Sequence, residues 1–162
     1  LVEQKNHQLL IDSFAEFNKT NSAYRLIILG SGPLLPALKD RIKKLNLEDK
    51  IFLLGQKRNV LEYMFVSDFF VMASRIEGFP IVCLEALAVG LPVVSTRVAG
   101  LDEAIIDGYN GYLAEEESPA SMAEVMQKVA SRDPGYFSRN CKATAQKYDI
   151  SSVINQLTKV MF

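Results

Sequence analysis

Short apolar runs alternate with amphipathic segments along most of this chain. The apolar runs are rich in β-branched and aromatic residues, and they lie at 24–29, 51–55, 68–72 and 92–96. Because neither face of these runs is regularly polar, they predict strands that are buried on both sides, as in a parallel sheet covered by helices. The alternation therefore predicts an α/β fold with a doubly wound, Rossmann-like parallel sheet.

The segments between the strands carry helix signals. Asn6 and Ser118 can cap helices, and Pro119 suits a first helical position. Gly90 and Pro92 are placed to end a helix. Further helices are expected at 35–45, 60–65, 80–88, 136–147 and 151–161, and a brief strand at 112–113.

The chain opens directly into its first helix, although a doubly wound domain normally leads that helix with a strand. Leu1 and Val2 can supply only the tail of such a strand. In the common strand order 3-2-1-4-5-6 the missing strand would be the central one, and its loss would leave a gap in the sheet. We therefore expect residues 1–162 to form a single domain whose start is truncated from a larger chain.

Composition argues against several classes of protein. Of the 162 residues, 49% are hydrophobic, and 18 basic residues nearly balance 19 acidic ones. The scattered charge argues against nucleic-acid binding, which needs a concentrated basic face. The apolar runs are too short to span a membrane, and we expect no secretory leader. The two cysteines, Cys83 and Cys141, show no metal-binding spacing, so a reduced, cytoplasmic environment is expected.

A single charged side chain, Glu85, interrupts the apolar run at 79–94. The segment has no obviously polar helical face, which predicts that this carboxylate lies at least partly inside the protein. An unpaired buried carboxylate would cost on the order of several kcal/mol, so Glu85 needs partners. A helix N-terminus, a protein cation or the two hydroxyls of a ligand diol could each serve.

Glu77 precedes the same helix, in a loop at the carboxyl end of the strand at 68–72. Gly78 would let a ligand approach the backbone closely, and Pro80 suits the first helical turn. The free amides from Ile81 onward would favour phosphate oxygens. These features suit a nucleotide diphosphate-sugar, although a solvated loop glutamate and a structurally paired helix glutamate remain open alternatives.

Residues 74–113 resemble the signature region of retaining glycosyltransferases of family 4, reading SRIEGFPIVCLEALAVGLPVVSTRVAGLDEAIIDGYNGYL. They contain a Glu-x7-Glu pair, a Gly-x-Pro after the first Glu, a Gly-x-Pro-Val-Val strand entry and an Asp-Gly-x-Asn-Gly turn. Earlier segments of the family are similar to LVEQKNHQLLIDSF, YRLIILGSGP and IFLLGQKRNV. The resemblance covers the whole chain and implies the C-terminal, nucleotide-sugar-binding half of a GT-B glycosyltransferase, without the N-terminal acceptor domain.

The resemblance also implies roles for individual residues. Glu77 would contact the donor sugar and Lys5 would neutralise the diphosphate, which makes these two the expected catalytic residues. Glu85 would bind the ribose hydroxyls. Phosphate and sugar oxygens would be held by the backbone of Gly78, Phe79, Pro80, Ile81 and Val82. The base of the nucleotide would contact a second loop, formed by Gln56, Lys57 and Arg58.

The implied reaction is the retaining transfer of a hexosyl group from an NDP-sugar, with a UDP-sugar preferred, to an acceptor hydroxyl. The acceptor would be a sugar or glycolipid in surface polysaccharide or glycolipid synthesis, bound through the missing N-terminal domain. The chain has no Asp-x-Asp motif, so neither a metal nor a cofactor is expected. The expected setting is cytoplasmic, with peripheral association at the inner face of the cell membrane by analogy only.

Two departures from the family pattern stand out. Family members usually carry a Gly-Arg pair just before the segment equivalent to 1–5, and its Arg binds the diphosphate; the present sequence begins after that pair. Ala99 and Gly100 replace a common Gly-Gly pair. The fragment alone is therefore expected to be inactive.

Other interpretations of the sequence differ in class. A nicotinamide enzyme is disfavoured because Leu35 replaces the third Gly of a dinucleotide fingerprint, and no acid follows the next strand. A UDP-sugar 2-epimerase shares the two-half fold but lacks the EGFPIVCLEA pattern. A non-catalytic nucleotide-sugar-binding module is the third alternative. In each case His7 is expected to be an exposed first-turn residue rather than a ligand or a base.

Overall fold

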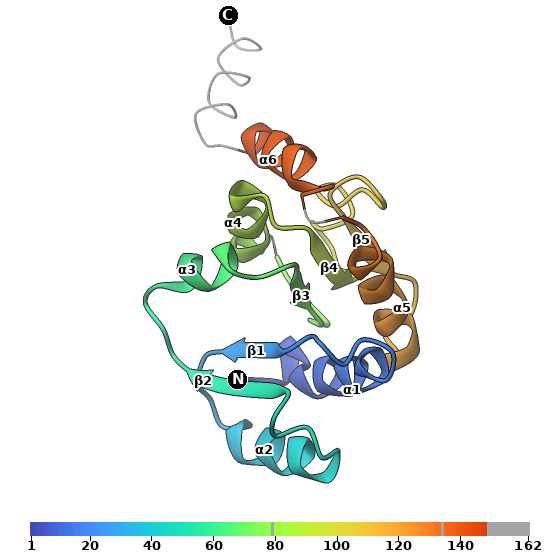
Figure 1. Cartoon of the computed structure of the whole chain (residues 1–162). Helices are drawn as coiled ribbons and strands as arrows, with labels where there is room; N and C mark the ends of the chain where they lie inside the picture. The colour runs from blue at the N-terminus through green and yellow to red at the C-terminus, as the bar shows by residue number, and fades with distance from the viewer. Residues whose placement is uncertain (79, 134, 149–162) are drawn as a thin grey trace, which may run out of the picture.

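The computed structural model of the chain describes residues 1–78, 80–133 and 135–148, and these form helices packed against two parallel sheets (Figure 1). The elements in chain order are η1 (Glu3–Lys5), α1 (His7–Asn18), β1 (Leu26–Leu29), α2 (Leu35–Lys44), β2 (Ile51–Gly55), α3 (Val60–Phe65), β3 (Phe70–Met72), α4 (Ile81–Val89), β4 (Val93–Thr96), β5 (Gly111–Ala114), α5 (Pro119–Ala130) and α6 (Ser138–Lys147).

This order confirms the predicted alternation of strands and helices. The expected caps are present: the Asn6 side chain accepts a hydrogen bond from the Leu9 amide at 3.4 Å, and the Ser118 hydroxyl accepts one from the Ser121 amide at 3.2 Å. Gly90 ends α4 with a φ of 90°, a conformation that favours glycine. The sequence did not predict the short turn η1, and the helix predicted at 151–161 lies outside the described residues.

The three-stranded sheet carries helices on both faces. Its order is β3-β4-β5, all parallel, and all four residues of β4 are buried. Successive strand residues point to opposite faces, so both faces of β4 must be covered. Helix α5 contacts β4 and β5, and α4, which packs against α6, also contacts β4. This arrangement fits the doubly wound α/β class predicted from the sequence.

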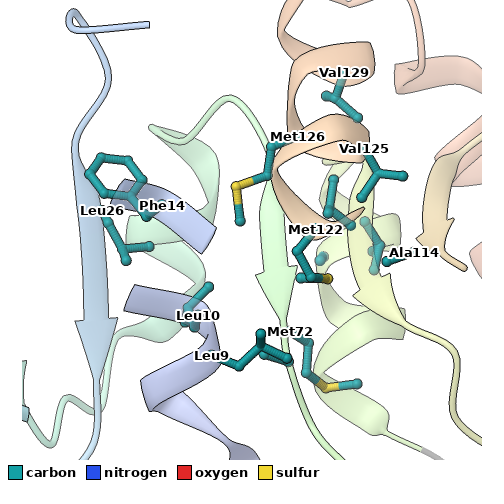
Figure 2. Packing of buried hydrophobic residues seen from close by; sticks show 14 of the residues in the cluster. Leu9, Leu10, Phe14, Leu26, Met72, Ala114, Met122, Val125, Met126 and Val129 are labelled. Carbon is teal, nitrogen blue, oxygen red and sulfur yellow. The ribbon is translucent and has the colours of Figure 1, made fainter. Parts of the chain in front are cut away.

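The second sheet contains only β1 and β2, which are also parallel. Helix α1 packs against α5 and thereby joins this sheet to the first. Figure 2 shows Phe14 of α1 beside Leu26 of β1, while Leu9 lies toward Met72 of β3. The three residues from α1 and β1 and Met72 all belong to one buried apolar cluster, so a single core spans both sheets.

An open cavity of about 950 Å³ separates the two sheets. The described strands β1 and β3 do not pair with each other, and both line the cavity. The resulting order is β2-β1, a gap, then β3-β4-β5. This gap falls where the predicted strand order places its central strand.

Leu1 enters at the carboxyl end of β1. Its backbone nitrogen donates to the Ser31 carbonyl, and its own carbonyl accepts from the Leu34 amide at 3.4 Å. A Cβ on Gly32 would collide with the Leu1 backbone, so this turn needs a glycine. The start of the chain therefore lies tightly against the loop that follows β1.

Asn110 fixes the turn before β5 to α6. Its Nδ2 donates to the Ala104 carbonyl at 2.8 Å and to the Thr144 hydroxyl at 2.9 Å, and its Oδ1 accepts from the Ile106 amide at 2.8 Å. The Asn110 side chain is fully buried. Its hydrogen bonds therefore satisfy polar groups that water does not reach.

Asn110→Ala should lower the free energy of unfolding by about 3 kcal/mol, because buried partners of the amide lose their hydrogen bonds. Urea denaturation would measure the change. Asn140→Ala is the matched control, since Asn140 joins α6 to the same turn through an exposed bond to the Tyr109 carbonyl at 3.0 Å. Equal losses from both variants would contradict the importance of burial at Asn110.

Candidate active site

Two predicted residues meet at the carboxyl end of the sheets. Lys5 lies at the end of η1, and Glu77 lies in the loop between β3 and α4; Lys5 Nζ is 2.6 Å from Glu77 Oε1. The backbone supports this contact, because the Arg75 amide donates to the Gln4 carbonyl at 2.9 Å. The Thr96 hydroxyl donates to the Ser74 carbonyl at 2.6 Å and ties the same loop to the end of β4.

The Lys5–Glu77 ion pair joins a mostly buried carboxylate to a partly exposed lysine. The Glu77 side chain is 11% exposed and that of Lys5 is 45% exposed. Burial acts to raise the pKa of Glu77, but the hydrogen bond from Lys5 and the charge of Lys5 help to hold that pKa below its usual range. The Glu77 carboxylate is therefore charged at neutral pH, and Lys5 compensates its charge.

The N-terminus of α4 lies just beyond Glu77. Pro80 is buried and extended, and its carbonyl accepts from the Cys83 amide at 2.9 Å. Among the described residues, none accepts a hydrogen bond from the amides of Ile81 or Val82. These amides and the helix dipole can therefore serve an anion. The predicted neighbour Phe79 lies outside the described residues.

Glu85 does not occupy the predicted buried position. The residue is exposed, whereas Cys83, Ala86 and Leu87 form the buried side of α4. With about 3.6 residues per turn, Glu85 lies on the same exposed stripe as Ile81, which is 69% exposed. The prediction was wrong because α4 is apolar nearly all round, while its neighbours cover only one side. No described residue hydrogen-bonds to Glu85 or forms an ion pair with it.

The loop predicted to touch a base is accessible. Gln56, Lys57 and Arg58 are all exposed in the connection between β2 and α3, and Gly78 is exposed beside Glu77. Figure 1 shows the β2–α3 connection running along one side of the molecule from β2 to α3. No hydrogen bond or ion pair within the described ranges joins this loop to Lys5 or Glu77.

His7 differs from its predicted exposed position. The side chain is partly buried and lines the cavity between β1 and β3. Burial, together with the charges of the N-terminal ammonium and Lys5, lowers the pKa of His7 to about 4. The imidazole is therefore neutral at neutral pH, and its buried Nδ1 has no hydrogen-bond partner among the described residues.

Sequence reasoning missed a cluster that flanks the Lys5–Glu77 pair. Glu117, in the loop between β5 and α5, accepts from Asn6 Nδ2 at 2.8 Å and from Arg75 Nε at 2.8 Å. Asn6 had a predicted role only as a helix cap. The acidic run that includes Glu117 was a visible signal, but Asn6 and Glu117 are 111 positions apart in the sequence, so no local pattern indicates their contact.

Two further findings concern the described part of the chain. No group of three or more His, Cys, Asp or Glu residues there could hold a metal ion. None of its helices is long and apolar enough to cross a membrane.

The sequence profile of one family, described as "Glycosyl transferases group 1", matches residues 1–148. The chain therefore belongs to the group 1 glycosyltransferases. This finding confirms that the chain is a glycosyltransferase, as the Glu-x7-Glu block indicates, and it favours this class over the nicotinamide enzyme and the epimerase.

Known relatives agree with this assignment. The chain is 35% identical to the N-acetylgalactosamine-N,N'-diacetylbacillosaminyl-diphospho-undecaprenol 4-alpha-N-acetylgalactosaminyltransferase of Campylobacter jejuni, across 99% of the chain and 44% of that protein. A structure of S. aureus TarM with fondaparinux, alpha-GlcNAc-glycerol and UDP matches with a TM-score of 0.88 and 26% identity, across 99% of the chain and 33% of TarM. Anabaena HepE in complex with UDP and glucose matches with a TM-score of 0.86 and 24% identity, across 99% of the chain and 45% of HepE.

The structural matches establish the fold as that of GT-B glycosyltransferases, as predicted. The chain spans less than half the length of each of these relatives.

Lys5→Met should raise the pKa of Glu77, because burial of the carboxyl group remains while its hydrogen bond and counter-charge are lost. In the unchanged protein the charged pair persists as the pH falls, until the pH passes the lowered pKa of Glu77. An NMR titration of the carboxyl carbon would measure both curves. Lys57→Met removes another exposed lysine and should leave the titration of Glu77 unaltered; an equal shift in that control would refute a specific effect of Lys5.

Proposed function

We propose that residues 1–162 form the donor-binding half of a retaining glycosyltransferase that moves a hexosyl group from a UDP-sugar to an acceptor hydroxyl. The observation that carries this proposal is the 2.6 Å contact between Lys5 and Glu77, beside the unpaired amides of α4, in a group 1 glycosyltransferase. A cation, an acid and a helix N-terminus at one edge suit a diphosphate with a sugar attached. Matching structures that contain UDP support the choice of nucleotide.

In this proposal Lys5, which pairs with Glu77 in the absence of donor, binds the diphosphate instead. Lys5 turns from the carboxylate to the phosphate oxygens, while the amides of Ile81 and Val82 donate to the same anion. Glu77 is then free to accept hydrogen bonds from sugar hydroxyls. Gly78 lets the donor approach the backbone, and Phe79 and Pro80 lie along the same segment.

The proposed ribose site is on the exposed stripe of α4. Glu85 has two carboxylate oxygens that can each accept from one hydroxyl of a diol. Because the acid is exposed, the nucleotide does not need to displace a protein partner from it. Gln56, Lys57 and Arg58 would contact the base, mainly through their backbone.

The proposed chemistry needs electrostatic stabilisation more than a protein nucleophile. As the bond from the anomeric carbon to the diphosphate breaks, negative charge grows on the leaving UDP, and Lys5 and the α4 amides offset it. The acceptor oxygen bonds to the anomeric carbon on the same face, and its proton departs with UDP. Configuration is thereby retained, and neither a metal nor a cofactor takes part.

We also propose that the cavity between β1 and β3 holds a strand that precedes Leu1 in a longer chain. Two strands with one parallel strand between them lie about twice the 4.8 Å strand spacing apart. A strand in the cavity would pair with the open edges of β1 and β3. The described lining is largely apolar, and the unpartnered His7 Nδ1 adjoins it. Amides of β1 and β3 should exchange with solvent much more slowly in the longer chain; equal exchange would exclude the strand.

The acceptor half of such an enzyme would lie outside residues 1–162. Relatives named for undecaprenol-linked sugars and for colanic acid biosynthesis support a sugar or glycolipid acceptor in surface polysaccharide or glycolipid synthesis. We accordingly propose a cytoplasmic enzyme that works at the inner face of the cell membrane through peripheral association.

The decisive experiment combines donor binding with product analysis, both measured on the intact chain, meaning the longer protein that contains residues 1–162 together with the proposed acceptor half. A thermal-shift panel would compare UDP-glucose, UDP-N-acetylglucosamine, GDP-mannose and ADP-glucose, and a UDP-sugar should give the largest shift. NMR of the transfer product should show the anomeric configuration of the donor, and EDTA should leave the rate unchanged. Binding without turnover would favour a non-catalytic module, whereas an inverted product or a C2 epimer would overturn the proposed reaction.

Glu85→Ala should weaken UDP binding by about 1–3 kcal/mol, because hydrogen bonds to a charged acceptor are lost. Isothermal titration calorimetry would measure the affinity. Glu48→Ala removes a second exposed glutamate, in the connection between α2 and β2, and should not change it. Unchanged affinity in the Glu85 variant would remove Glu85 from the nucleotide site.

A further inference from the structure

We infer that Glu117 is a positioning residue, which holds the Lys5 turn and the Glu77 loop in the arrangement that the donor meets. This inference rests on the proposed function and adds to it a residue that touches neither donor nor acceptor. Glu117 lies between β5 and α5, directly before the Ser118 cap of α5.

One oxygen of Glu117 links the neighbours of both catalytic residues. Oε1 accepts from Asn6 Nδ2 and from Arg75 Nε, each at 2.8 Å. Asn6 directly follows Lys5 in the chain, and Arg75 lies two residues before Glu77. A shift of the Glu117 carboxylate would therefore release both flanks of the Lys5–Glu77 pair together.

The conformation of Asn6 turns its amide group toward Glu117. Asn6 is buried, with a φ of 46°, and its Oδ1 accepts from the Leu9 amide at 3.4 Å. With Oδ1 occupied by the helix, Nδ2 is the atom that remains for Glu117. The same residue ends η1 and caps α1, so its orientation sets the direction in which the chain leaves Lys5.

The contacts of Glu117 with Asn6 and Arg75 are expected to matter more for the geometry of the site than for folding stability. The side chains of Arg75 and Glu117 are 56% and 45% exposed, and exposed ion pairs contribute little to stability. Catalysis is more sensitive, since a displacement of about 1 Å can lower a rate about a hundredfold. Loss of Glu117 should therefore reduce turnover far more than it reduces the melting temperature.

The acidic run itself provides a matched control. Glu116 is the neighbouring exposed glutamate, and its side chain forms no ion pair or hydrogen bond within the described ranges. Glu115 instead lies 3.0 Å from Arg97, at the loop that follows β4. Removal of Glu116 changes the net charge as removal of Glu117 does, but it leaves the contacts of Asn6 and Arg75 intact.

The first test measures UDP release by the intact chain from UDP-glucose or UDP-N-acetylglucosamine, whichever gives the larger thermal shift. Glu117→Ala should lower kcat about tenfold or more, with the donor KM changed less than about threefold. Its melting temperature should stay within about 4 °C of the unchanged protein. Glu116→Ala should alter none of these quantities, and equal effects of the two variants would overturn the inference.

A second test asks whether Glu117 acts through Glu77. If it does, Glu117→Ala should cause little further loss of kcat once Glu77→Ala is present. Independent, additive losses would show that Glu117 works elsewhere. This readout separates positioning from a general loss of structure, which would add to any other defect.

A swap of hydrogen-bond roles provides the rescue. Asn6→Asp alone places a carboxylate against Glu117 and should lower kcat, whereas adding Glu117→Gln lets the new amide donate to the new acid and should restore most of it. Failure of this rescue would contradict the inference, and the swap decides the matter even if Glu117→Ala does not fold.

The controls keep the two proposals distinguishable. If Lys5→Ala and Glu77→Ala both leave turnover unchanged, the proposed active site is wrong. If those variants lose turnover while Glu117→Ala does not, the active site stands and the positioning role fails.

Discussion

Within residues 1–162, the relative placement of the two sheets determines how Lys5 and Glu77 meet. The described strands β1 and β3 share no backbone hydrogen bonds, so the usual ladder does not fix their spacing. Packing of α1 against α5 and a few contacts at the carboxyl edge do so instead. The contact of Arg75 with Gln4 and that of Lys5 with Glu77 cross this divide, which makes the site sensitive to how firmly the two parts are joined.

Much of the fold was predictable because it depends on local patterns. Alternating apolar runs and amphipathic segments identified the strands and most helices, and the caps at Asn6 and Ser118 followed from ordinary residue preferences. The boundaries moved by one or two residues, as for β3, where Phe70 rather than Asp68 begins the strand. The gap in the sheet was also foreseeable, since the first helix had no strand before it.

The site was predictable only where a motif carried it. Glu77 was singled out by its place after a strand, the roles of Lys5 and Glu77 came from a family resemblance, and the structure brings the two residues together. The burial of Glu85 was mispredicted because hydropathy reports how apolar a helix is and not which side its neighbours cover. Glu117 escaped attention because its partners are distant in sequence, and no pattern within one segment reveals such a contact.

The tight seating of Leu1 against the loop after β1 has a practical consequence for protein engineering. Because Leu1 lines the largely apolar cavity between β1 and β3, a polypeptide fused directly to this residue would begin beside that cavity. The sequence of a purification tag or linker there would thus influence stability: alternating aliphatic side chains suit such surroundings, whereas a polyhistidine or charged spacer would resist them. Placement of the tag thereby becomes a variable that affects folding yield.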